Sequence, residues 1–484
     1  MTLPSSGSCP PSPLGTPSVD MPSPFNAASA DEFRRGACPA LSAPMQTGDG
    51  LLARIALTEA ITPAAFESLA RLALKHGNGM LDISARGNLQ VRGLSPQSAP
   101  LLDVDVRALA LPLRDGLAVE TPPLAGLDPD EITDPRPLAA EIAVKARNLS
   151  GLAPKMSVVV DGHGQLTLAM LIADIRLVAF RSSDSGAPAQ PILWKILLGG
   201  IESSGHIFAA LPAAEAVAAT IGLLEELSDL GPKARGRDLA KPYPRNAETM
   251  PAATSPLGLH HVTAKTSAGK PRPSATDTIG TCTIDTCAMG IGLPYGQIHA
   301  ERLIALAGEA TRLGIAALKP ALDHSILAFG EEPACLSLAA FAANHGFIVS
   351  GTDPRAHIAA CTGSPACASA RADTHQLADT AAKTFADLLD GSFKLHVSGC
   401  AKGCAHPQAS ALVLTGTSSQ FSLISGGRPG DLPFATVDFA DTNATLRRLA
   451  DLIFAERRQN ETSAACIARL GQVRLAAAAT SGRP

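Results

Sequence analysis

The hydrophobic pattern of this chain changes repeatedly between helical and strand-like spacing. Apolar side chains recur at helical spacing over residues 63–75, and Thr62 before Pro63 is placed to serve as an N-cap. A glycine-rich segment then ends the predicted helix, and two short strands are predicted over residues 80–84 and 88–92. The pattern therefore predicts one helix followed by a pair of strands.

The same pattern occurs a second time, half a chain later. Residues 61–93 and 298–330 each read as a helix, a glycine break, a strand, a turn, a second strand and a final glycine. The two segments are both 33 residues long and start 237 residues apart, although few of their residues are identical. An internal repeat of this kind predicts two related halves packed about a pseudo-two-fold axis, with a site between them.

The remaining segments predict further elements around the two copies. These are a β-hairpin over 154–180 with its turn at 161–164, helices over 212–229, 374–389 and 445–458, and a strand over 392–397. Residues 231–280 are rich in Pro, Lys, Arg, Ser and Thr and predict a linker between the halves. Residues 1–30 are Pro/Ser-rich and predict a disordered tail.

Composition limits the classes of protein to which the chain can belong. The formal net charge of −4 and the pI of about 6.3 argue against a general nucleic-acid binder, which needs a basic excess. Ten cysteines in 484 residues are too few for a disulfide scaffold. No apolar run approaches the ~18–20 residues of a membrane span, and the N-terminus lacks the pattern of a signal peptide. We expect a cytoplasmic protein of two or three domains with reduced cysteines.

Four cysteines form two close pairs in the last third of the chain. Five residues separate Cys361 from Cys367, three separate Cys400 from Cys404, and 32 residues lie between the pairs. Small residues surround these cysteines, so backbone N–H groups can approach the sulfur atoms. Four thiolates in this arrangement predict an iron–sulfur cluster. A structural zinc site and plain buried thiols remain alternatives, although zinc prefers shorter spacings.

These features together resemble those of the sulfite/nitrite reductase superfamily. The resemblance rests on the half-repeat, the cysteine spacing and the Ser84-x-Arg86-x-x-x-Gln90 segment, and it covers residues 31–470. Within the superfamily, the chain is most similar to the precorrin-3B synthase family. The matching segments are RRGACPALSAPMQTGDGLLARI (34–55), PPLAGLDP (122–129), DPR (353–355), AACTGSPACASA (359–370) and LHVSGCAKGCAHP (395–407).

The resemblance implies an α+β fold with two pseudo-symmetric halves of the sulfite/nitrite reductase type. Each half is expected to contain a ferredoxin-like half-domain and a larger α/β domain. The expected divisions are a disordered tail over 1–30, half-domains over 31–100 and 281–350, a first α/β domain over 101–230, a linker over 231–280 and a second, cluster-bearing α/β domain over 351–475.

The resemblance also implies an activity in cobalamin biosynthesis. Members of the precorrin-3B synthase family are monooxygenases that use dioxygen to hydroxylate C20 of precorrin-3A and form the ring A γ-lactone. A [4Fe–4S] cluster on Cys361, Cys367, Cys400 and Cys404 is implied, and a mononuclear non-haem iron is also associated with the family. No G-x-G-x-x-G segment follows a predicted strand, so we expect an external NADH-linked reductase as the electron donor.

A tetrapyrrole substrate carries several carboxylates, so its site must supply Arg and Lys side chains. The candidates for tetrapyrrole binding are Arg86, Gln90, Arg92, Lys155 and Arg355. The resemblance itself places Arg86 and Gln90 against the tetrapyrrole and matches Lys155 to a lysine of the reductases. Three alternatives stay open: a solvated strand edge for the arginines near residue 90, a solvated side chain for Lys155, and a local ion pair between Arg355 and Asp353.

Two other functions remain open. A sirohaem-dependent sulfite or nitrite reductase would share the fold, but Lys402 within the second cysteine pair and Ser157 at the position of a second lysine depart from the reductase pattern. A non-catalytic iron–sulfur electron carrier would need the cluster but neither Arg86 nor a large cavity between the halves.

The sequence does not select ligands for a second iron. His299-Ala-Glu301 has the form of an iron-binding pair but lies at a predicted helix start, where Glu301 would offset the helix dipole. His396 and His406 flank the second cysteine pair. The other cysteines, which are Cys9, Cys38, Cys282, Cys287, Cys335 and Cys466, show no clear partner pattern.

Overall fold

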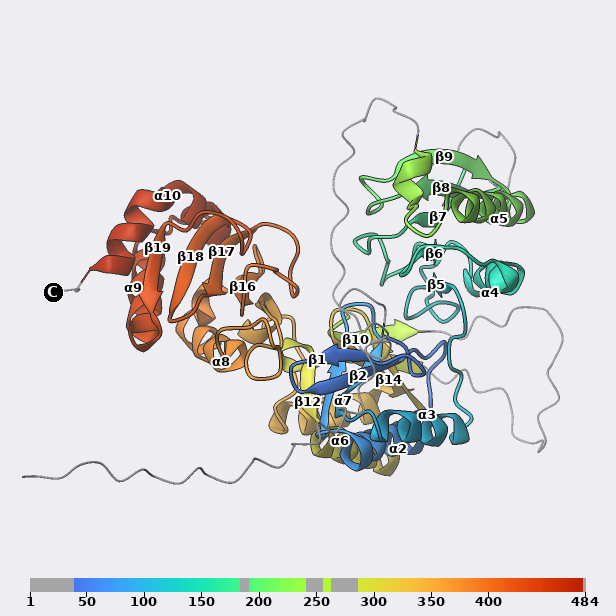
Figure 1. Ribbon diagram of the computed structural model, residues 1–484, viewed down its shortest axis with the longest axis horizontal. Coiled ribbons are helices and arrows are strands. Elements are labelled where there is room, and N and C mark those ends of the chain that lie inside the picture. The colour runs from blue at the N-terminus through green and yellow to red at the C-terminus, as the bar shows by residue number, and fades with distance from the viewer. Residues whose placement is uncertain (1–38, 183–190, 241–255, 263–285, 482–484) are drawn as a thin grey trace, which may run out of the picture.

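A computed structural model describes residues 39–182, 191–240, 256–262 and 286–481 (Figure 1). The predicted tail over 1–30 lies outside these described residues, as do Cys9, Cys38 and Cys282. Two α/β domains, coloured teal to green and orange to red in Figure 1, flank a central unit built from both halves of the chain. The observed fold confirms the predicted α+β class with two pseudo-symmetric halves.

The central unit contains two antiparallel sheets that share one hydrophobic core. The first sheet has the order β1 (Met45–Thr47), β2 (Gly50–Ile55), β4 (Leu89–Leu94), β3 (Met80–Ile83) and β12 (Gln297–His299). The second has the order β10 (Gly258–Val262), β11 (Thr286–Gly292), β14 (Ser325–Glu331) and β13 (Ala317–Ala321). The helices of the central unit are α2 (Pro63–His76), α3 (Ser98–Ala108), α6 (Ala300–Arg312) and α7 (Glu332–Asn344).

The predicted repeat is confirmed at the level of single residue pairs. Helices α2 and α6 begin at Pro63 and Ala300, which are 237 residues apart, and pack against each other. Ile61 forms a β-bridge with Leu318 of the second copy. The equivalent pair, Ile298 with Leu81, joins β12 to β3. Each copy thus completes the sheet edge of the other, as a two-fold axis requires.

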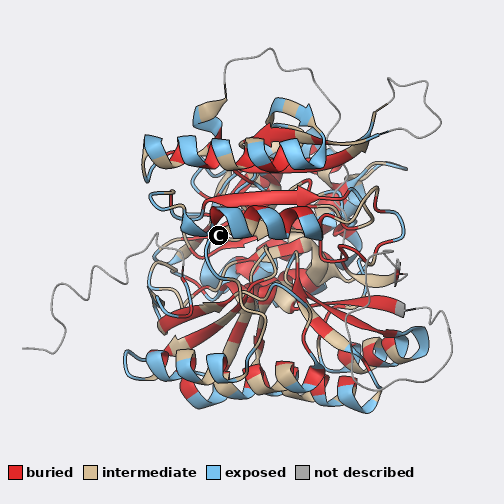
Figure 2. Cartoon of the chain, turned by 90° about the vertical axis from the view of Figure 1, so that its right-hand side faces the viewer, coloured by how far each residue is buried: buried red, intermediate tan, exposed pale blue. Residues whose placement is uncertain are grey.

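Helix α2 illustrates why these residues form these elements. The Thr62 hydroxyl accepts a hydrogen bond from the Ala65 N–H, which confirms the predicted N-cap. Phe66, Leu69 and Ala73 repeat at helical spacing and are buried against the sheets. Figure 2 shows this division across the molecule, with buried residues along the sheets and exposed residues on the outer faces of the helices.

The two α/β domains have the same topology. The first contains β5 (Ala118–Glu120), β6 (Ser157–Asp161), β7 (Ile175–Arg181), β8 (Ile192–Leu198) and β9 (His206–Leu211), with α4 (Arg136–Lys145) and α5 (Ala213–Leu230). The second contains β15 (Ile358–Ala360), β16 (Leu395–Ser398), β17 (Ser410–Gly416), β18 (Gln420–Gly427) and β19 (Ala435–Asp438), with α8 (Thr374–Thr384), α9 (Thr442–Glu456) and α10 (Ser463–Thr480). In each sheet the first three strands run parallel to one another. The fourth strand is antiparallel to the third, and the fifth is antiparallel to the fourth.

The predicted hairpin over 154–180 is wrong, because β6 and β7 run parallel. The segment 162–174 is a connecting loop rather than a tight turn. Every residue of β6 is buried, and a continuous apolar run of this kind is typical of a parallel strand covered on both faces. The glycines after Asp161 therefore mark the exit of a central strand.

Three predicted boundaries differ from the observed elements. Strand β10 lies within 231–280, the predicted linker, because it pairs with β11 in the second sheet. Helix α3 runs across residue 100, since Leu102 and Val106 belong to the central core. The last helix, α10, extends to Thr480, beyond residue 475. Over the described ranges, no helix is both long and apolar enough to span a membrane.

Candidate functional site

The two cysteine loops lie at the same edge of the second α/β sheet. Cys361 directly follows β15 and Cys400 follows β16, and these strands are parallel neighbours, so their carboxyl ends meet. The Gly399 N–H donates a hydrogen bond of 3.2 Å to Cys361 Sγ. A Cβ atom on Gly399 would lie 2.6 Å from the Ala370 Cβ atom, so this close approach requires glycine. Gly399 therefore brings a backbone N–H of the second cysteine loop against a sulfur atom of the first.

Three of the cysteines act electrostatically on the fourth, Cys404. Burial raises the pKa of the Cys404 thiol, and Cys361, Cys400 and Cys367 raise it further. Crowded thiols of this kind are stabilised as thiolates when a cationic iron centre binds them. Cysteine thiolates with N–H···S contacts are the donors that an iron–sulfur cluster uses. Over the described ranges, however, no three His, Cys, Asp or Glu side chains are grouped closely enough to hold a metal ion, so the four sulfur atoms are brought to one edge of the sheet without forming a closed ligand set.

Two histidines lie behind the second cysteine loop. His396 on β16 is fully buried, and neither of its ring nitrogens has a hydrogen-bond partner among the described residues. The His406 ring lies edge-on to it, with 5.8 Å between the ring centroids. Burial lowers the pKa of His396 to about 4, and His406 adds to the shift. The imidazole of His396 is therefore neutral near pH 7.

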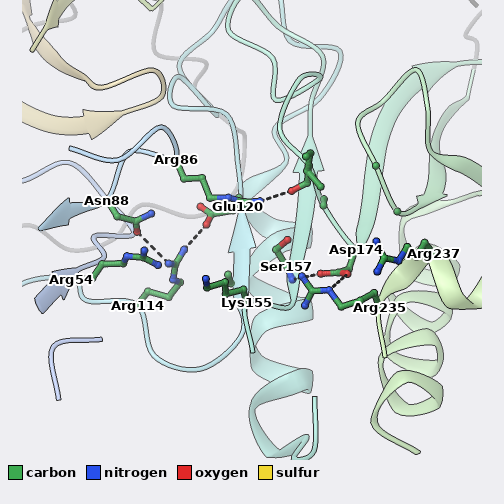
Figure 3. Close-up of a pocket in the computed structure, with 15 residues that line it drawn as sticks. Arg54, Arg86, Asn88, Arg114, Glu120, Lys155, Ser157, Asp174, Arg235 and Arg237 are labelled. Carbon is green, nitrogen blue, oxygen red and sulfur yellow. Dashed lines mark hydrogen bonds and ion pairs between the residues drawn. The ribbon is translucent and has the colours of Figure 1, made fainter. Parts of the chain in front are cut away.

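A basic pocket lies between the first half-domain and the first α/β domain (Figure 3). Its volume is about 380 Å³. Six cationic side chains line it: Arg54, Arg86, Arg114, Lys155, Arg235 and Arg237. Among the described residues, two carboxylates, those of Glu120 and Asp174, line the same pocket, which leaves an excess of four positive charges. A pocket of this charge favours a ligand with several anionic groups.

Contacts within the pocket hold several of these cations in place. Arg114 Nη1 lies 2.6 Å from Glu120 Oε1, and Arg235 Nε lies 3.3 Å from Asp174 Oδ1. Arg86 Nη2 donates to the carbonyl of Ile172 at 2.5 Å. Burial lowers the pKa of the Arg86 guanidinium; Glu120 opposes this shift and Arg114 adds to it.

In the second half, the residues at the equivalent positions form an ion pair. Asp323 lies 237 residues after Arg86, and Lys394 precedes β16 as Lys155 precedes β6. Lys394 Nζ lies 3.4 Å from Asp323 Oδ2 and also donates to the Ala356 carbonyl. In the second half this lysine is therefore paired with a carboxylate, whereas the first half presents Arg86 and Lys155 to the same cavity.

The structure brings together only part of the predicted tetrapyrrole-binding set. Arg86 and Lys155 line the basic pocket. Gln90 lies on β4 opposite Arg54, outside the residues that line it. Arg92 is only 4% exposed and pairs with two aspartates, as described below. Arg355 pairs with Asp353 and donates to the carbonyls of Gly346 and Phe347, which matches the local alternative.

Sequence reasoning missed four arginines of the pocket. Arg54 lies on β2, Arg114 follows α3, and Arg235 and Arg237 lie in the predicted linker. The basic composition of that linker was a signal, but no local pattern connects it with residues near Arg86. His299 is the N-cap of α6, which confirms the helix start predicted there. Cys287, Cys335 and Cys466 are buried in hydrophobic cores.

Comparison with known proteins agrees with this geometry. Residues 43–108 match the family described as the nitrite/sulfite reductase ferredoxin-like half domain. The chain is 38% identical over 470 residues to a precorrin-3B synthase from Sinorhizobium sp., covering 96% of this chain and 99% of that protein.

A solved structure shares the fold. The NirA protein of Mycobacterium tuberculosis has a TM-score of 0.63 and 17% identity, over 88% of this chain and 84% of that chain. The identity over nearly the full length, together with the half-domain match, establishes the family. The chain belongs to the precorrin-3B synthase family of the sulfite/nitrite reductase superfamily.

Proposed function

We propose that this enzyme is a precorrin-3B synthase, a monooxygenase that hydroxylates C20 of precorrin-3A and forms the ring A γ-lactone. The observation that carries this proposal is the basic pocket with its excess of four positive charges. Precorrin-3A is a macrocycle with several carboxylates, so its anionic arms complement this charge. The relative from Sinorhizobium sp., itself named precorrin-3B synthase, supports the same conclusion.

The arginines of the pocket bind and orient the macrocycle in this proposal. Arg86 donates to a backbone carbonyl at present, and a substrate carboxylate would be a stronger acceptor for its guanidinium. Arg114 and Arg235 are already fixed by Glu120 and Asp174, which lowers the entropic cost of ordering them on binding. A volume of about 380 Å³ accepts the carboxylate arms and one edge of the ring.

Cys361, Cys367, Cys400 and Cys404 hold a [4Fe–4S] cluster in this proposal. The N–H···S contact from Gly399 and the effect of the other three cysteines on the pKa of Cys404 support it. When bound, the cluster supplies electrons singly. An external NADH-linked reductase provides two electrons, so that one atom of dioxygen enters the C–O bond at C20 and the other leaves as water.

A mononuclear non-haem iron remains part of the proposal without assigned ligands. Such iron centres commonly use two histidines and a carboxylate. No group of this kind occurs over the ranges that the structure covers, and His299 caps a helix instead. Mössbauer spectroscopy with iron and sulfide analysis would separate cubane iron from a mononuclear ion.

The decisive experiment uses the full chain with its cluster reconstituted under anaerobic conditions. The protein is incubated with precorrin-3A and a reductant, oxygen is admitted, and the product is examined by mass spectrometry. We expect a gain of one oxygen atom, which is labelled when ¹⁸O₂ is used. An unchanged tetrapyrrole with an intact cluster would favour an electron carrier instead. An intense Soret band in the purified protein would indicate sirohaem and contradict the proposal.

A further inference from the structure

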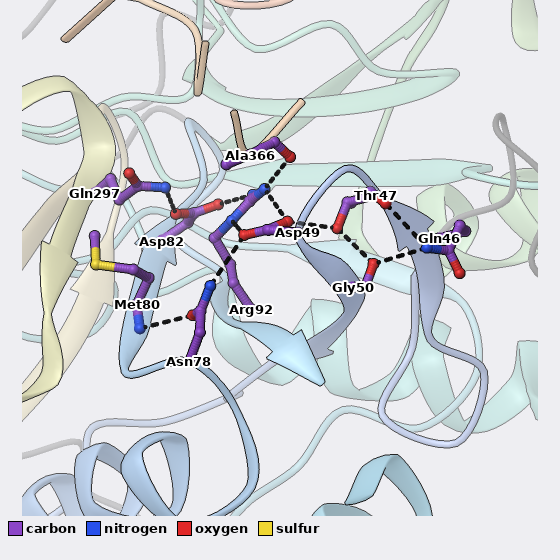
Figure 4. A network of polar contacts seen from close by, with 10 residues as sticks. All are labelled: Gln46, Thr47, Asp49, Gly50, Asn78, Met80, Asp82, Arg92, Gln297 and Ala366. Atoms are coloured by element: carbon purple, nitrogen blue, oxygen red, sulfur yellow. Dashed lines mark hydrogen bonds and ion pairs between the residues drawn. The ribbon is translucent and has the colours of Figure 1, made fainter. Parts of the chain in front are cut away.

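A buried arginine network joins the first half-domain to the first cysteine loop (Figure 4). Arg92 on β4 is 4% exposed, and its guanidinium bonds both Asp49 and Asp82. The distances are 2.9 Å from Nη2 to Asp49 Oδ1, 3.0 Å from Nε to Asp49 Oδ2, and 2.8 Å from Nη1 to Asp82 Oδ2. The side chain is therefore fully committed inside the protein.

Arg92 also makes one hydrogen bond to a residue of another domain. Its Nη2 lies 3.3 Å from the carbonyl oxygen of Ala366, which immediately precedes Cys367. The Gly48 N–H donates to the same oxygen at 3.1 Å. Two donors of the first half-domain thus meet one carbonyl of the cysteine loop. That carbonyl is the backbone link to Cys367.

The fit at Gly48 is too close for any side chain. A Cβ atom there would lie 2.5 Å from the Ala368 nitrogen and 2.9 Å from the Ala366 oxygen. Both are backbone atoms, which cannot swing aside as a flexible side chain can. The turn between β1 and β2 therefore lies directly against the residues on both sides of Cys367.

The network is also anchored in the second copy. Asp82 accepts a hydrogen bond of 2.8 Å from Gln297 Nε2 on β12, and Asp49 accepts one from the Thr47 hydroxyl at 2.7 Å. Because β4 also pairs with the strand of Arg54, the sheet that holds Arg92 also carries a residue of the basic pocket. One sheet thus supports both the cysteine loop and part of the pocket.

We propose that Arg92 and Gly48 form a clamp that positions Cys367 relative to the other three cysteines and to the basic pocket. Arg92 is then a positioning residue and not a tetrapyrrole contact. The inference that this positions an iron–sulfur cluster rests on the proposed function, but the clamp itself can be tested on the cluster-free protein.

The test measures alkylation of each cysteine in the reduced, cluster-free full chain by mass spectrometry. In Arg92→Gln, we expect Cys367 to react about tenfold or more faster, because hydrogen bonds to a charged group are lost. Cys335 and Cys466 are fully buried in separate cores and should keep their wild-type rates, which reports that the fold is intact. Arg92→Lys keeps the positive charge but loses the planar, multiple-donor guanidinium. It should therefore restore only part of the protection of Cys367 against alkylation.

Gly48→Ala tests the same contact with every charge left in place. It should raise the reactivity of Cys367 in the same direction, and in the reconstituted protein it should change the electron paramagnetic resonance signal of the reduced cluster. Two control variants are matched to these changes. Arg71→Gln removes an exposed arginine that pairs with Glu67 in the same half-domain, and Gly308→Ala adds a methyl group where nothing lies within 4 Å.

The outcomes separate this inference from the proposed function. Wild-type reactivity of Cys367 in both test variants would overturn the clamp. Joint exposure of Cys335 and Cys466 would also overturn it, because Arg92 would then serve the fold as a whole. A cluster that survives Cys367→Ser would refute the ligand assignment of the proposed function, while the alkylation result would still decide the clamp.

Discussion

At the scale of residues, the two halves differ most clearly in the charge of one position. Arg86 in the first copy corresponds to Asp323 in the second. Asp323 forms an ion pair with Lys394, whereas Arg86 and Lys155 line the same pocket as two cations. The related lysines, Lys155 and Lys394, therefore have opposite surroundings. In the present structure, the first copy offers basic groups to a pocket, whereas the lysine of the second copy is paired with a carboxylate.

Arg86→Gln should weaken binding of precorrin-3A. The loss of one charge-assisted hydrogen bond in a partly buried site predicts an increase in Kd of about 10- to 100-fold. Titration of the cluster-free protein, followed by absorbance of the tetrapyrrole, measures this change. Arg71→Gln should leave Kd unaltered, because Arg71 pairs with Glu67 on an exposed helix face. Equal Kd values for all three proteins would remove Arg86 from the site.

His396 should make the protein less stable in mild acid. Its folded pKa of about 4 lies below the ordinary value of 6.5, so the unfolded chain binds the proton more readily. The contribution of neutral His396 to the free energy of unfolding is fully present above about pH 6.5. It is lost as the pH falls toward 4, which lowers the free energy of unfolding by up to roughly 3 kcal/mol. Urea unfolding of the cluster-free protein across this range should show a smaller pH effect in His396→Leu than in wild type. His345→Leu, at an exposed position, should keep the wild-type profile.

At the scale of elements, the loop between β6 and β7 forms one wall of the basic pocket. Arg176 on β7 is fully buried and donates to the carbonyls of Leu168 and Leu171 in that loop. The same loop supplies Ile172 and Asp174 to the pocket. The buried strand therefore fixes the loop, and the loop fixes part of the site.

Arg176→Met should destabilise the protein by about 3 kcal/mol, because two loop carbonyls and Asp161 would lose their buried partner. Urea unfolding measures the free-energy change. Limited proteolysis should show earlier cleavage between residues 162 and 174. Arg181→Met, at the exposed end of the same strand, should change neither quantity by more than about 0.5 kcal/mol. Similar values for the two variants would mean that Arg176 does not hold the loop.

The elements that could be predicted are those specified by local chemistry. Thr62, Pro63 and the apolar spacing define α2, and the copied pattern defines α6. The parallel pairing of β6 with β7 could not be predicted, because a glycine-rich exit from a buried strand has the same composition as a hairpin turn. The basic pocket draws on residues from Arg54 to Arg237, and no local pattern records which distant segments meet.

At the scale of the whole molecule, the cysteine loops and the basic pocket lie on different α/β domains. The cysteine loops belong to the domain of β15–β19, whereas the pocket lies between the first half-domain and the domain of β5–β9. The central unit of half-domains is the connection between them (Figure 1). Cluster loading and tetrapyrrole binding should therefore be separable by mutation.

Cys404→Ser should abolish the visible absorbance of the reconstituted cluster and leave the Kd for precorrin-3A within about twofold of wild type. Arg86→Gln should show the converse, with full iron and sulfide content and weakened binding. Iron analysis and tetrapyrrole titration on the same preparations measure both. Loss of binding in Cys404→Ser would mean that the substrate reaches the cysteine loops and that the two sites are one.

The exchanged bridges of the central unit have a consequence for how the chain can be divided. Ile61 completes the edge of the second sheet and Ile298 that of the first, so neither half can close its own sheets. A fragment ending at residue 240 and another starting at residue 256 would each expose a strand edge that the other covers. Co-expressed as separate polypeptides, they should associate into a stable heterodimer, whereas each fragment alone should aggregate. The chain thus behaves as a dimer of halves that are joined in one polypeptide.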